Sequence, residues 1–322
     1  MAQVAVRGVR PRDKPTFLAR LVGAPSKMQA RKALWGYLFL LPWLIGMLVF
    51  IVGPIIASFI LSFTEYDVLS PPRFIGLDNY IKAFTGDSLF WPSIGRTFEY
   101  ALGVVPLGLL GSLLLAMLLS RQTRSVYVFR TFFFIPSLTP AVALALLWTW
   151  IFAPTVGPIN VTLAYIGIQG PGWLTSATWA LPGLLIITLW ASMGGNTMLI
   201  FLAGLKGVPR ELYDAAEIDG AGRWARFRNI TLPMISPTIL FNLILGVIGA
   251  LKVFTLSFVA TSGGPSYSTW FFALHIYQQA FSYFKMGYGS ALAWIFLVML
   301  LVFTYFQLMY SRRWVYYAGG KD

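Results

Sequence analysis

The chain has 322 residues, of which 57% are hydrophobic and 11% are charged, and its formal net charge is +13. Soluble chains carry roughly a quarter charged residues, so this composition excludes a soluble enzyme, a disordered protein and a disulfide-stabilised secreted protein. The absence of Cys excludes thiol catalysis and Cys-ligated metal, and the single His275 excludes a multi-histidine metal site. We therefore expect a membrane protein with several spans and no metal site.

Six apolar segments are each long enough to cross a membrane. About 20 apolar residues span the hydrocarbon layer, and uncharged runs of this length recur between clusters of Lys and Arg. The predicted spans are 35–63, 98–120, 132–152, 178–204, 234–260 and 288–311. The third and fourth are separated at 153–178, which is rich in Pro and Gly. The sequence therefore predicts an all-α integral membrane protein with three parts: a basic tail over 1–33, a membrane domain over 34–312 and a short tail over 313–322.

Lys and Arg are distributed unevenly between the two sides of these spans. Six spans place both termini on one side, and the tails and loops of that side contain 19 of the 24 basic residues. Lys252 lies within a span, and four basic residues lie on the other side: Arg73, Lys82, Arg96 and Lys285. Short loops rich in Lys and Arg stay in the cytoplasm. We therefore predict that both termini are cytoplasmic, and we interpret the net charge as a topology signal, with no nucleic-acid partner.

Two long segments lie on the opposite, outer side. The first, 64–97, predicts one short amphipathic helix near 78–85. The second, 262–287, is largely a loop with a short helix and several polar residues, including His275. Either these segments bind a partner protein or they close the end of the helical bundle, and the sequence favours neither.

The cytoplasmic loop 206–233 predicts two short helices joined by a turn. Pro209 suits the first turn of a helix, where Glu211 and Asp214 add favourable negative charge. Gly220 can adopt the left-handed conformation that ends such a helix. On the first helix, the side chains at i, i+3 and i+4 form a small face that another protein could approach closely: Leu212, Ala215 and Ala216.

The spacing in this loop resembles the signature of ABC-importer permeases. The pattern is Asp214-Ala215-Ala216, three residues, Gly220, nine residues, and then 230–233 with the sequence Ile-Thr-Leu-Pro. Asp214 stands where the family usually has Glu. Further segments between 38 and 310 are similar to the carbohydrate-uptake branch, which includes maltose-type and glycerol-3-phosphate-type permeases: 63–67, 74–80, 129–131, 201–205 and 261–265.

The resemblance implies the type I ABC importer permease fold, with six transmembrane helices and a cytoplasmic coupling helix between spans 4 and 5. It implies a location in a bacterial or archaeal inner membrane and pairing with a second homologous permease subunit. Two cytoplasmic ABC ATPase subunits would bind the loop, and an extracytoplasmic sugar-binding protein would deliver the sugar. ATP would be bound by the ATPase subunits, since this sequence has no phosphate-binding loop, so we expect no cofactor and no catalytic residue.

Two groups of candidate site residues follow. The residues expected to couple to the ATPase are Glu211, Leu212, Asp214, Ala215, Ala216, Asp219, Gly220, Arg223 and Phe227. The candidates for the substrate path are polar or aromatic residues within the spans: Lys252, Asn196, Trp190, Asn242, Phe254 and Trp294. Polar groups inside a membrane are costly and often functional. The alternatives are that Lys252 extends its amine to the outer headgroups and that the two Asn side chains link helices.

A second function class is an intramembrane enzyme acting on lipid-linked sugars. Such an enzyme needs acidic or His groups gathered at one membrane depth. The eleven acidic residues lie almost entirely in loops and tails. The sequence therefore favours the importer subunit, whose substrate would be a sugar.

Overall fold

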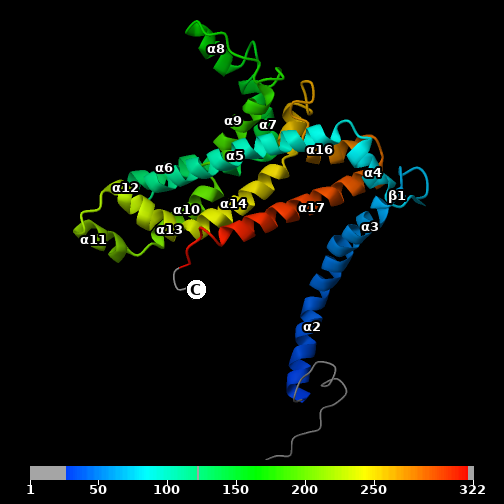
Figure 1. Cartoon of the computed structure of the whole chain (residues 1–322), viewed down its shortest axis with the longest axis horizontal. Coiled ribbons are helices and arrows are strands. Elements are labelled where there is room, and N and C mark those ends of the chain that lie inside the picture. Colours follow the sequence, from blue (N-terminus) through cyan, green and yellow to red (C-terminus); the bar gives the residue numbers. More distant parts are fainter. Residues whose placement is uncertain (1–26, 122, 318–322) are drawn as a thin grey trace, which may run out of the picture. The chain divides into compact units, whose positions relative to one another are not determined.

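The computed structural model describes residues 27–121 and 123–317 of the chain (Figure 1). The backbone forms two compact units, Met1–Ile60 and Leu61–Asp322. Most of the predicted N-terminal tail, 1–26, and the last five residues of the C-terminal tail lie outside the described residues.

The described part of the first unit is a long apolar helix. It comprises α2 (Lys27–Met47), a short π-helical segment η1 (Leu48–Val52) and α3 (Gly53–Ser62), which extends into the second unit. Helix begins earlier than the predicted span at 35, so residues 27–33 of the predicted tail are helical. The most apolar 18-residue window within Arg31–Ser62 has a mean hydropathy of 2.7, and none of the residues in that window is buried. Pro54 has no N–H to donate, and the Gly53 N–H bonds to the Leu48 carbonyl, which gives the π-helical turn.

The second unit begins with a small hairpin and a helix. Strand β1 (Thr64–Glu65) pairs antiparallel with β2 (Arg73–Phe74), so the all-α prediction is wrong in this detail. Helix α4 (Asp78–Thr85) confirms the short helix predicted near 78–85. The buried Asn79 joins these parts, because its Nδ2 donates to the carbonyls of Ser62 (3.0 Å) and Thr64 (2.9 Å).

The second predicted span begins earlier than expected. Helix α5 (Phe90–Leu118) starts before 98, and just ahead of it the Asp87 carboxylate accepts the Leu89 N–H (2.9 Å). Arg96 and Glu99, which ended the apolar run in the sequence, form an exposed ion pair (2.7 Å) on the helix surface. The helix therefore continues through a charged pair one turn apart.

The third and fourth predicted spans are bent. The third consists of α6 (Arg124–Phe134), a 3-10 turn η2 (Ile135–Leu138) and α7 (Ala141–Ile151), with an angle of 97° between its halves. Pro136 and Pro140 lie at that bend. The fourth consists of α9 (Ala180–Ser192) and α10 (Asn196–Lys206), bent by 48° at a Gly pair. Between them, the stretch expected to be only a connection contains α8 (Pro158–Tyr165).

The remaining helices follow in chain order. They are α11 (Arg210–Ile218), α12 (Arg223–Arg226), the π-helical η3 (Phe227–Thr231), α13 (Leu232–Met234), α14 (Ser236–Leu251), α15 (Thr255–Ala260), α16 (Phe272–Tyr277), the π-helical η4 (Gln278–Ser282) and α17 (Met286–Ser311). The fifth predicted span, 234–260, is therefore interrupted between α14 and α15. The sixth, 288–311, matches α17 closely.

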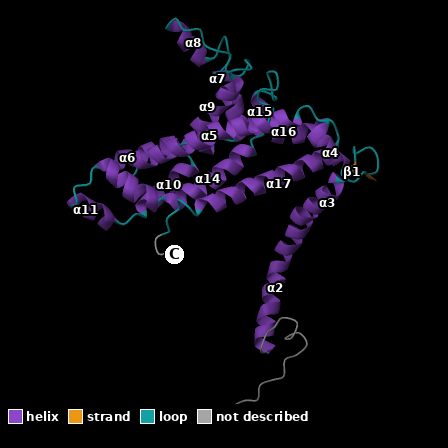
Figure 2. Ribbon diagram, in the orientation of Figure 1, coloured by secondary structure: helices purple, strands orange, loops and turns teal. Residues whose placement is uncertain are grey.

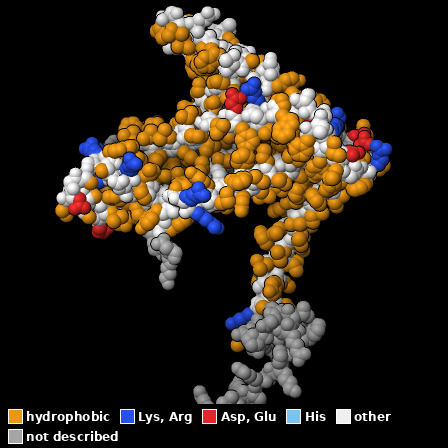
Figure 3. All heavy atoms as spheres, viewed as in Figure 1, with side chains coloured by type: hydrophobic (Ala, Val, Ile, Leu, Met, Phe, Trp, Pro, Cys, Tyr) orange, Lys and Arg blue, Asp and Glu red, His pale blue; other side chains and the backbone are white. Residues whose placement is uncertain are grey.

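The described residues are mostly helical (Figure 2). Within residues 27–121 and 123–317, four helices are long and apolar enough to cross a membrane, and the number rises to six if each bent pair is one span. The predicted number of spans, six, is thus the largest number that helix length and composition support. The core of the second unit lies where α5 packs against α9, α10 and α14, around Tyr100, Leu184 and Ile187. Hydrophobic side chains cover most of the visible surface between α11 and β1 (Figure 3).

Candidate functional site

The turn after α11 has the geometry that the sequence predicted. Gly220 has a φ of +74°, which is the left-handed conformation. Around it the Asp219 N–H donates to the Ala215 carbonyl (3.0 Å), and the Ala221 N–H donates to the Ala216 carbonyl (2.8 Å). These bonds satisfy carbonyls at the helix end, as is usual where a Gly closes a helix. The helix therefore stops at a defined residue and the chain reverses into α12.

Three side-chain contacts hold this helical loop together. Arg226 forms an ion pair with Glu217 (2.9 Å), and the Trp224 and Phe227 rings lie 5.5 Å apart. The hydroxyls of Tyr213 and Thr231 are hydrogen-bonded (2.8 Å), which ties α11 to the chain just before α14. The ion pair joins α11 to α12, and the hydroxyl pair joins α11 to η3. The exposed side chains of the loop therefore form a single surface.

The candidate coupling residues lie on that surface. Ala216 and Phe227 are half-buried, and the other seven are exposed: Glu211, Leu212, Asp214, Ala215, Asp219, Gly220 and Arg223. Sequence reasoning did not single out Ile218, which is 88% exposed, or include Trp224, which is 71% exposed, among these residues. An apolar residue just before Asp219-Gly220 was the available signal for Ile218. Exposed apolar side chains beside charged ones are typical of a protein-binding surface.

A cavity of about 540 Å³ lies within the second unit, and helix interruptions meet at it. The bend between η2 and α7 contributes Thr139, and the bend between α9 and α10 contributes Gly195. The interruption between α14 and α15 contributes Val253 and Phe254. Non-helical backbone at membrane depth is tolerated where it is buried in protein or lines a water-filled space. Because three helix interruptions line the same cavity, we interpret it as a binding site rather than a packing defect.

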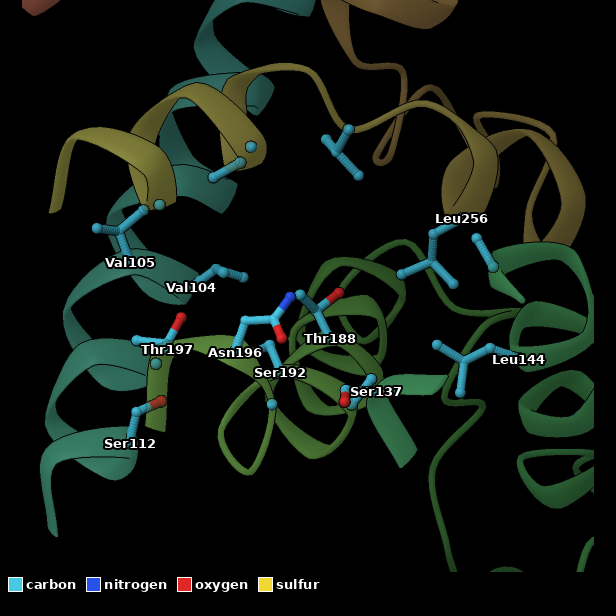
Figure 4. A pocket seen from close by; sticks show the side chains of 18 of the residues that line it. Val104, Val105, Ser112, Ser137, Leu144, Thr188, Ser192, Asn196, Thr197 and Leu256 are labelled. Carbon is cyan, nitrogen blue, oxygen red and sulfur yellow. The ribbon is translucent and has the colours of Figure 1, made fainter. Parts of the chain in front are cut away.

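The polar groups of this cavity are hydroxyls and amides. They belong to Tyr100, Ser112, Ser137, Thr139, Thr188, Ser192, Asn196, Thr197, Asn242 and Thr255. Figure 4 shows Thr188, Ser192 and Asn196 in the middle of the space. The Tyr100 and Thr188 hydroxyls are hydrogen-bonded (2.6 Å). Among the described residues that line it, none carries a formal charge. Such a lining suits a solute with many hydroxyl groups.

Three of the six predicted path residues line the cavity: Asn196, Asn242 and Phe254. Asn242 is 3% exposed, and within the described part of the chain its Nδ2 has no hydrogen-bond partner. The Phe254 ring stacks on Phe258 with centroids 5.3 Å apart. Sequence reasoning missed the hydroxyls of Tyr100, Ser112 and Thr188, although polar residues inside apolar helices were an available signal.

The other three predicted path residues lie elsewhere. Lys252, expected within a span, is exposed at the interruption that ends α14. Trp190 is 46% exposed and packs edge-to-face on Trp148, with centroids 5.4 Å apart. Trp294 is half-buried on α17. None of the three is among the residues that line the cavity.

Buried polar side chains join the two outer segments. His275 is fully buried, and its Nε2 lies 2.8 Å from Asp87 Oδ2. The Trp270 indole N–H donates to His275 Nδ1 (3.2 Å), and the Tyr288 hydroxyl donates to Asp87 (2.5 Å). Because an indole only donates, His275 Nδ1 must accept and its Nε2–H donates to the carboxylate. The segment before α5 is thereby connected to α16 and α17.

The charges of this cluster follow from its surroundings. Burial lowers the pKa of His275 below its ordinary 6.5, and the neighbouring Asp87 carboxylate only partly reverses this effect. Burial raises the pKa of Asp87, but hydrogen bonds from Tyr288, the Leu89 N–H and His275 outweigh it and leave the pKa below 3.8. At neutral pH the cluster therefore contains a carboxylate and a neutral imidazole. In the described residues, no group of three His, Cys, Asp or Glu side chains could hold a metal ion.

Comparison with known proteins identifies relatives over most of the chain. Residues 83–316 match the family described as binding-protein-dependent transport system inner membrane component. The probable ABC transporter permease protein YesP of Bacillus subtilis is 42% identical over 301 residues, which is 92% of this chain and 96% of YesP. The trehalose/maltose transport system permease protein MalF of Thermococcus litoralis is 34% identical over 291 residues, covering 89% of this chain and 97% of MalF.

One solved structure shares the fold. A chain of a bacterial ABC transporter involved in the import of the acidic polysaccharide alginate aligns with a TM-score of 0.79 and 24% sequence identity. The alignment covers 89% of this chain and 98% of that chain. This likeness shows that the two chains share a fold.

Proposed function

The chain belongs to the family of inner membrane components of binding-protein-dependent transport systems, and we propose that it forms half of the translocation channel of an ATP-driven sugar importer. Its relatives are named as permease subunits of ABC transporters, which confirms the resemblance in the loop 206–233. The chain is therefore a transport subunit and not an enzyme. An enzyme acting on lipid-linked sugars is not supported.

The proposed topology has six spans with both termini in the cytoplasm. Each bent pair, α6 with α7 and α9 with α10, is counted as one span. The excess of Lys and Arg in the tails and in the loops 121–131 and 205–233 supports this orientation. Helix α11, between the fourth and fifth spans, then faces the cytoplasm and acts as the coupling helix.

The observation that carries the proposed sugar path is the cavity where the helix interruptions meet. Its ten hydroxyl and amide side chains match the hydroxyl groups of a sugar, and Phe254 offers a flat face to a sugar ring. Relatives named for trehalose, maltose, lactose and starch degradation products support a sugar as the substrate class. Asn196, Asn242 and Phe254 are the proposed contacts from the predicted set. Lys252, Trp190 and Trp294 remain weaker candidates, since they lie outside the cavity.

The proposed partners follow from the family. A second homologous permease subunit completes the channel, two cytoplasmic ABC ATPase subunits bind the exposed coupling residues on α11 and α12, and an extracytoplasmic sugar-binding protein delivers the sugar. ATP binds to the ATPase subunits and this chain has no cofactor. A related transporter has been solved in complex with an alginate pentasaccharide-bound periplasmic protein, which supports the binding-protein partner.

Uptake by the reconstituted complex tests this function. Proteoliposomes containing both permeases and the ATPase, with ATP inside and the binding protein outside, are supplied with labelled maltose, trehalose, lactose and arabino-oligosaccharides. We expect at least one sugar to accumulate, only with ATP and only with the binding protein. Accumulation of a non-sugar solute in place of all four sugars, or sugar uptake without ATP, contradicts the proposal.

A further inference from the structure

A second cavity of about 640 Å³ lies at the opposite end of the second unit from β1, beside α11. It is formed where the C-terminal ends of α5 and α10 meet the first turns of α11. Its polar lining consists of three cations and three hydroxyls: Arg121, Lys206, Arg210, Ser120, Tyr213 and Thr231. The remaining lining residues are apolar, and no carboxylate lines the cavity among the described residues.

The three cations have no acidic partner. Within the described ranges, no carboxylate oxygen lies within 4.0 Å of Arg121, Lys206 or Arg210. Lys206 is in the last turn of α10, where a cation is favourable, but this does not account for the other two. The carbonyls of Leu119 and Arg121 after α5 already accept hydrogen bonds from the Arg130 guanidinium (2.9 and 3.2 Å). The Arg121 guanidinium is therefore not needed to cap that helix.

The floor of the cavity supplies a hydroxyl donor. Thr231 is 7% exposed, and its hydroxyl is hydrogen-bonded to that of Tyr213 (2.8 Å). In such a pair one hydroxyl donates to the other, so one O–H remains free to donate to a third group. Three cations around a buried O–H donor match a group with several anionic oxygens.

We propose that this cavity binds a phosphate group, either of an anionic phospholipid or of a soluble phosphate ester. Phosphate oxygens accept charge-assisted hydrogen bonds from several cations at once, and Arg suits this geometry best. Basic cavities between helices on the cytoplasmic side of a membrane bind anionic headgroups. Met117 and Leu205 supply apolar surface beside the cations, which suits the acyl chains of a lipid. A phosphate here contacts α5, α10 and α11 together, so it braces the coupling helix against the spans.

The test uses the whole transporter complex in nanodiscs and does not depend on knowing the sugar. The cavity variant replaces Arg121, Lys206 and Arg210 with Gln. The control variant replaces Arg124, Arg312 and Arg313 with Gln, which removes the same charge from exposed residues outside the cavity. The probes are phosphatidylglycerol, phosphatidylcholine and soluble glycerol phosphate. The readouts are lipid retention by native mass spectrometry and the melting temperature.

We expect phosphatidylglycerol to be retained and to raise the melting temperature in the wild type and the control, and its apparent affinity to fall by at least about tenfold in the cavity variant. If glycerol phosphate displaces phosphatidylglycerol, a soluble phosphate ester is sufficient for binding. If phosphatidylglycerol is retained and glycerol phosphate does not bind, the ligand is the lipid. Equal binding by the two variants, or closure of the cavity by the ATPase with neither probe bound, overturns the proposal.

This inference rests on the proposed cytoplasmic orientation, which labelling tests separately. Failure of the sugar assay leaves the binding result unchanged.

Discussion

Asn242 is buried within the apolar helix α14 with 3% of its surface exposed, and among the described residues its amide nitrogen has no partner. Leaving a buried donor unpaired costs about 1–3 kcal/mol. Asn160 is also buried, at 7% exposed, but its Nδ2 donates to two carbonyls and its Oδ1 accepts from Trp173. The two Asn side chains can therefore be compared directly. Asn242 lines the cavity and its amide nitrogen lacks a hydrogen bond among the described residues, whereas Asn160 lies away from the cavity and is fully hydrogen-bonded.

We predict that Asn242→Leu leaves the melting temperature unchanged or raises it, while the initial rate of sugar uptake falls. Leucine keeps the branching of Asn at Cγ and removes the unpaired donor, but it cannot hydrogen-bond to a sugar. Asn160→Leu should do the reverse, lowering the melting temperature because three hydrogen bonds are lost. Thermal unfolding and uptake measured on the same preparations check both variants. A destabilised Asn242→Leu complex with normal uptake would indicate a structural role.

His275 and Asp87 both have lowered pKa values, so both stabilise the folded chain more as the pH rises. The folded pKa of His275 lies below 6.5 and that of Asp87 below 3.8, so the unfolded chain binds more protons in acid. The contribution of His275 is therefore complete above pH 6.5 and declines as the pH falls below that value. That of Asp87 is lost only below about pH 3.8. Protonation of His275 also places an Nδ1–H against the Trp270 N–H, two donors facing each other.

We predict that the melting temperature of the complex falls between pH 7 and pH 5 and that His275→Gln reduces this fall. Gln donates to Asp87 but does not titrate. His275 is the only His of this chain, so the difference between the two pH profiles isolates it. Parallel profiles for the wild type and the variant would refute the assignment.

At the scale of elements, the turn between α11 and α12 depends on Gly220. A Cβ at Gly220 meets no atom within 4 Å, so any penalty there comes from its φ of +74°. Gly222 likewise has open space around a Cβ but has an ordinary φ of −68°. The two glycines differ in backbone conformation and not in room.

We predict that Gly220→Val introduces about 1–3 kcal/mol of backbone strain and weakens binding of the ATPase, whereas Gly222→Val does not. Membrane insertion should be normal in both, because it depends on the apolar spans. The ATPase that copurifies with each variant, and its stimulation by loaded binding protein, measure the effect. Full ATPase retention in Gly220→Val would show that the loop is a plain connector.

The bend between α9 and α10 depends on a close approach at Gly194. A Cβ there would lie 1.9 Å from the Phe133 carbonyl oxygen, so only Gly allows α6 this close. Gly95 in α5 has nothing within 4 Å of a Cβ and provides the control.

We predict that Gly194→Ala shifts the bend, lowers the melting temperature and reduces uptake, because Gly195 and Asn196 at the same bend line the 540 Å³ cavity. Gly95→Ala should be neutral or stabilise by about 0.5–1 kcal/mol, since it removes chain entropy from the unfolded state. Melting curves with parallel uptake assays separate the two. Equal behaviour of the variants would mean that the packing at Phe133 does not set the bend.

At the scale of the whole molecule, the proposed orientation is testable because the chain has no Cys of its own. Leu69 is 93% exposed, Tyr165 is 87% exposed and Ile218 is 88% exposed. We predict that single Cys residues at Leu69 and Tyr165 react with an impermeant thiol reagent in intact cells, and that Cys at Ile218 reacts only after the membrane is opened. Labelling of Ile218→Cys from outside would place α11 beyond the reach of a cytoplasmic ATPase.

The sequence by itself determined the features that depend on residues close together along the chain. Apolar length marked the membrane helices, amphipathic spacing located α4, and the need for a positive φ identified Gly220 as the end of α11. The motif spacing around Gly220 was enough to identify the family. Each of these is encoded within a few turns of one helix or loop.

Only the tertiary structure decided how sharply the helices bend and which side chains meet. Pro136, Pro140 and the Gly pair at 194–195 are visible in the sequence, but a hydropathy pattern does not give the angle of a bend. The Asp87 carboxylate accepts the Leu89 N–H just before α5, and Phe90 in the first turn of α5 packs edge-to-face on Phe272. Tyr100 meets Thr188 across 88 residues, and Asp87 meets His275 across 188. Contacts over such separations arise from how whole helices pack, and that packing is not expressed in any local pattern of residues.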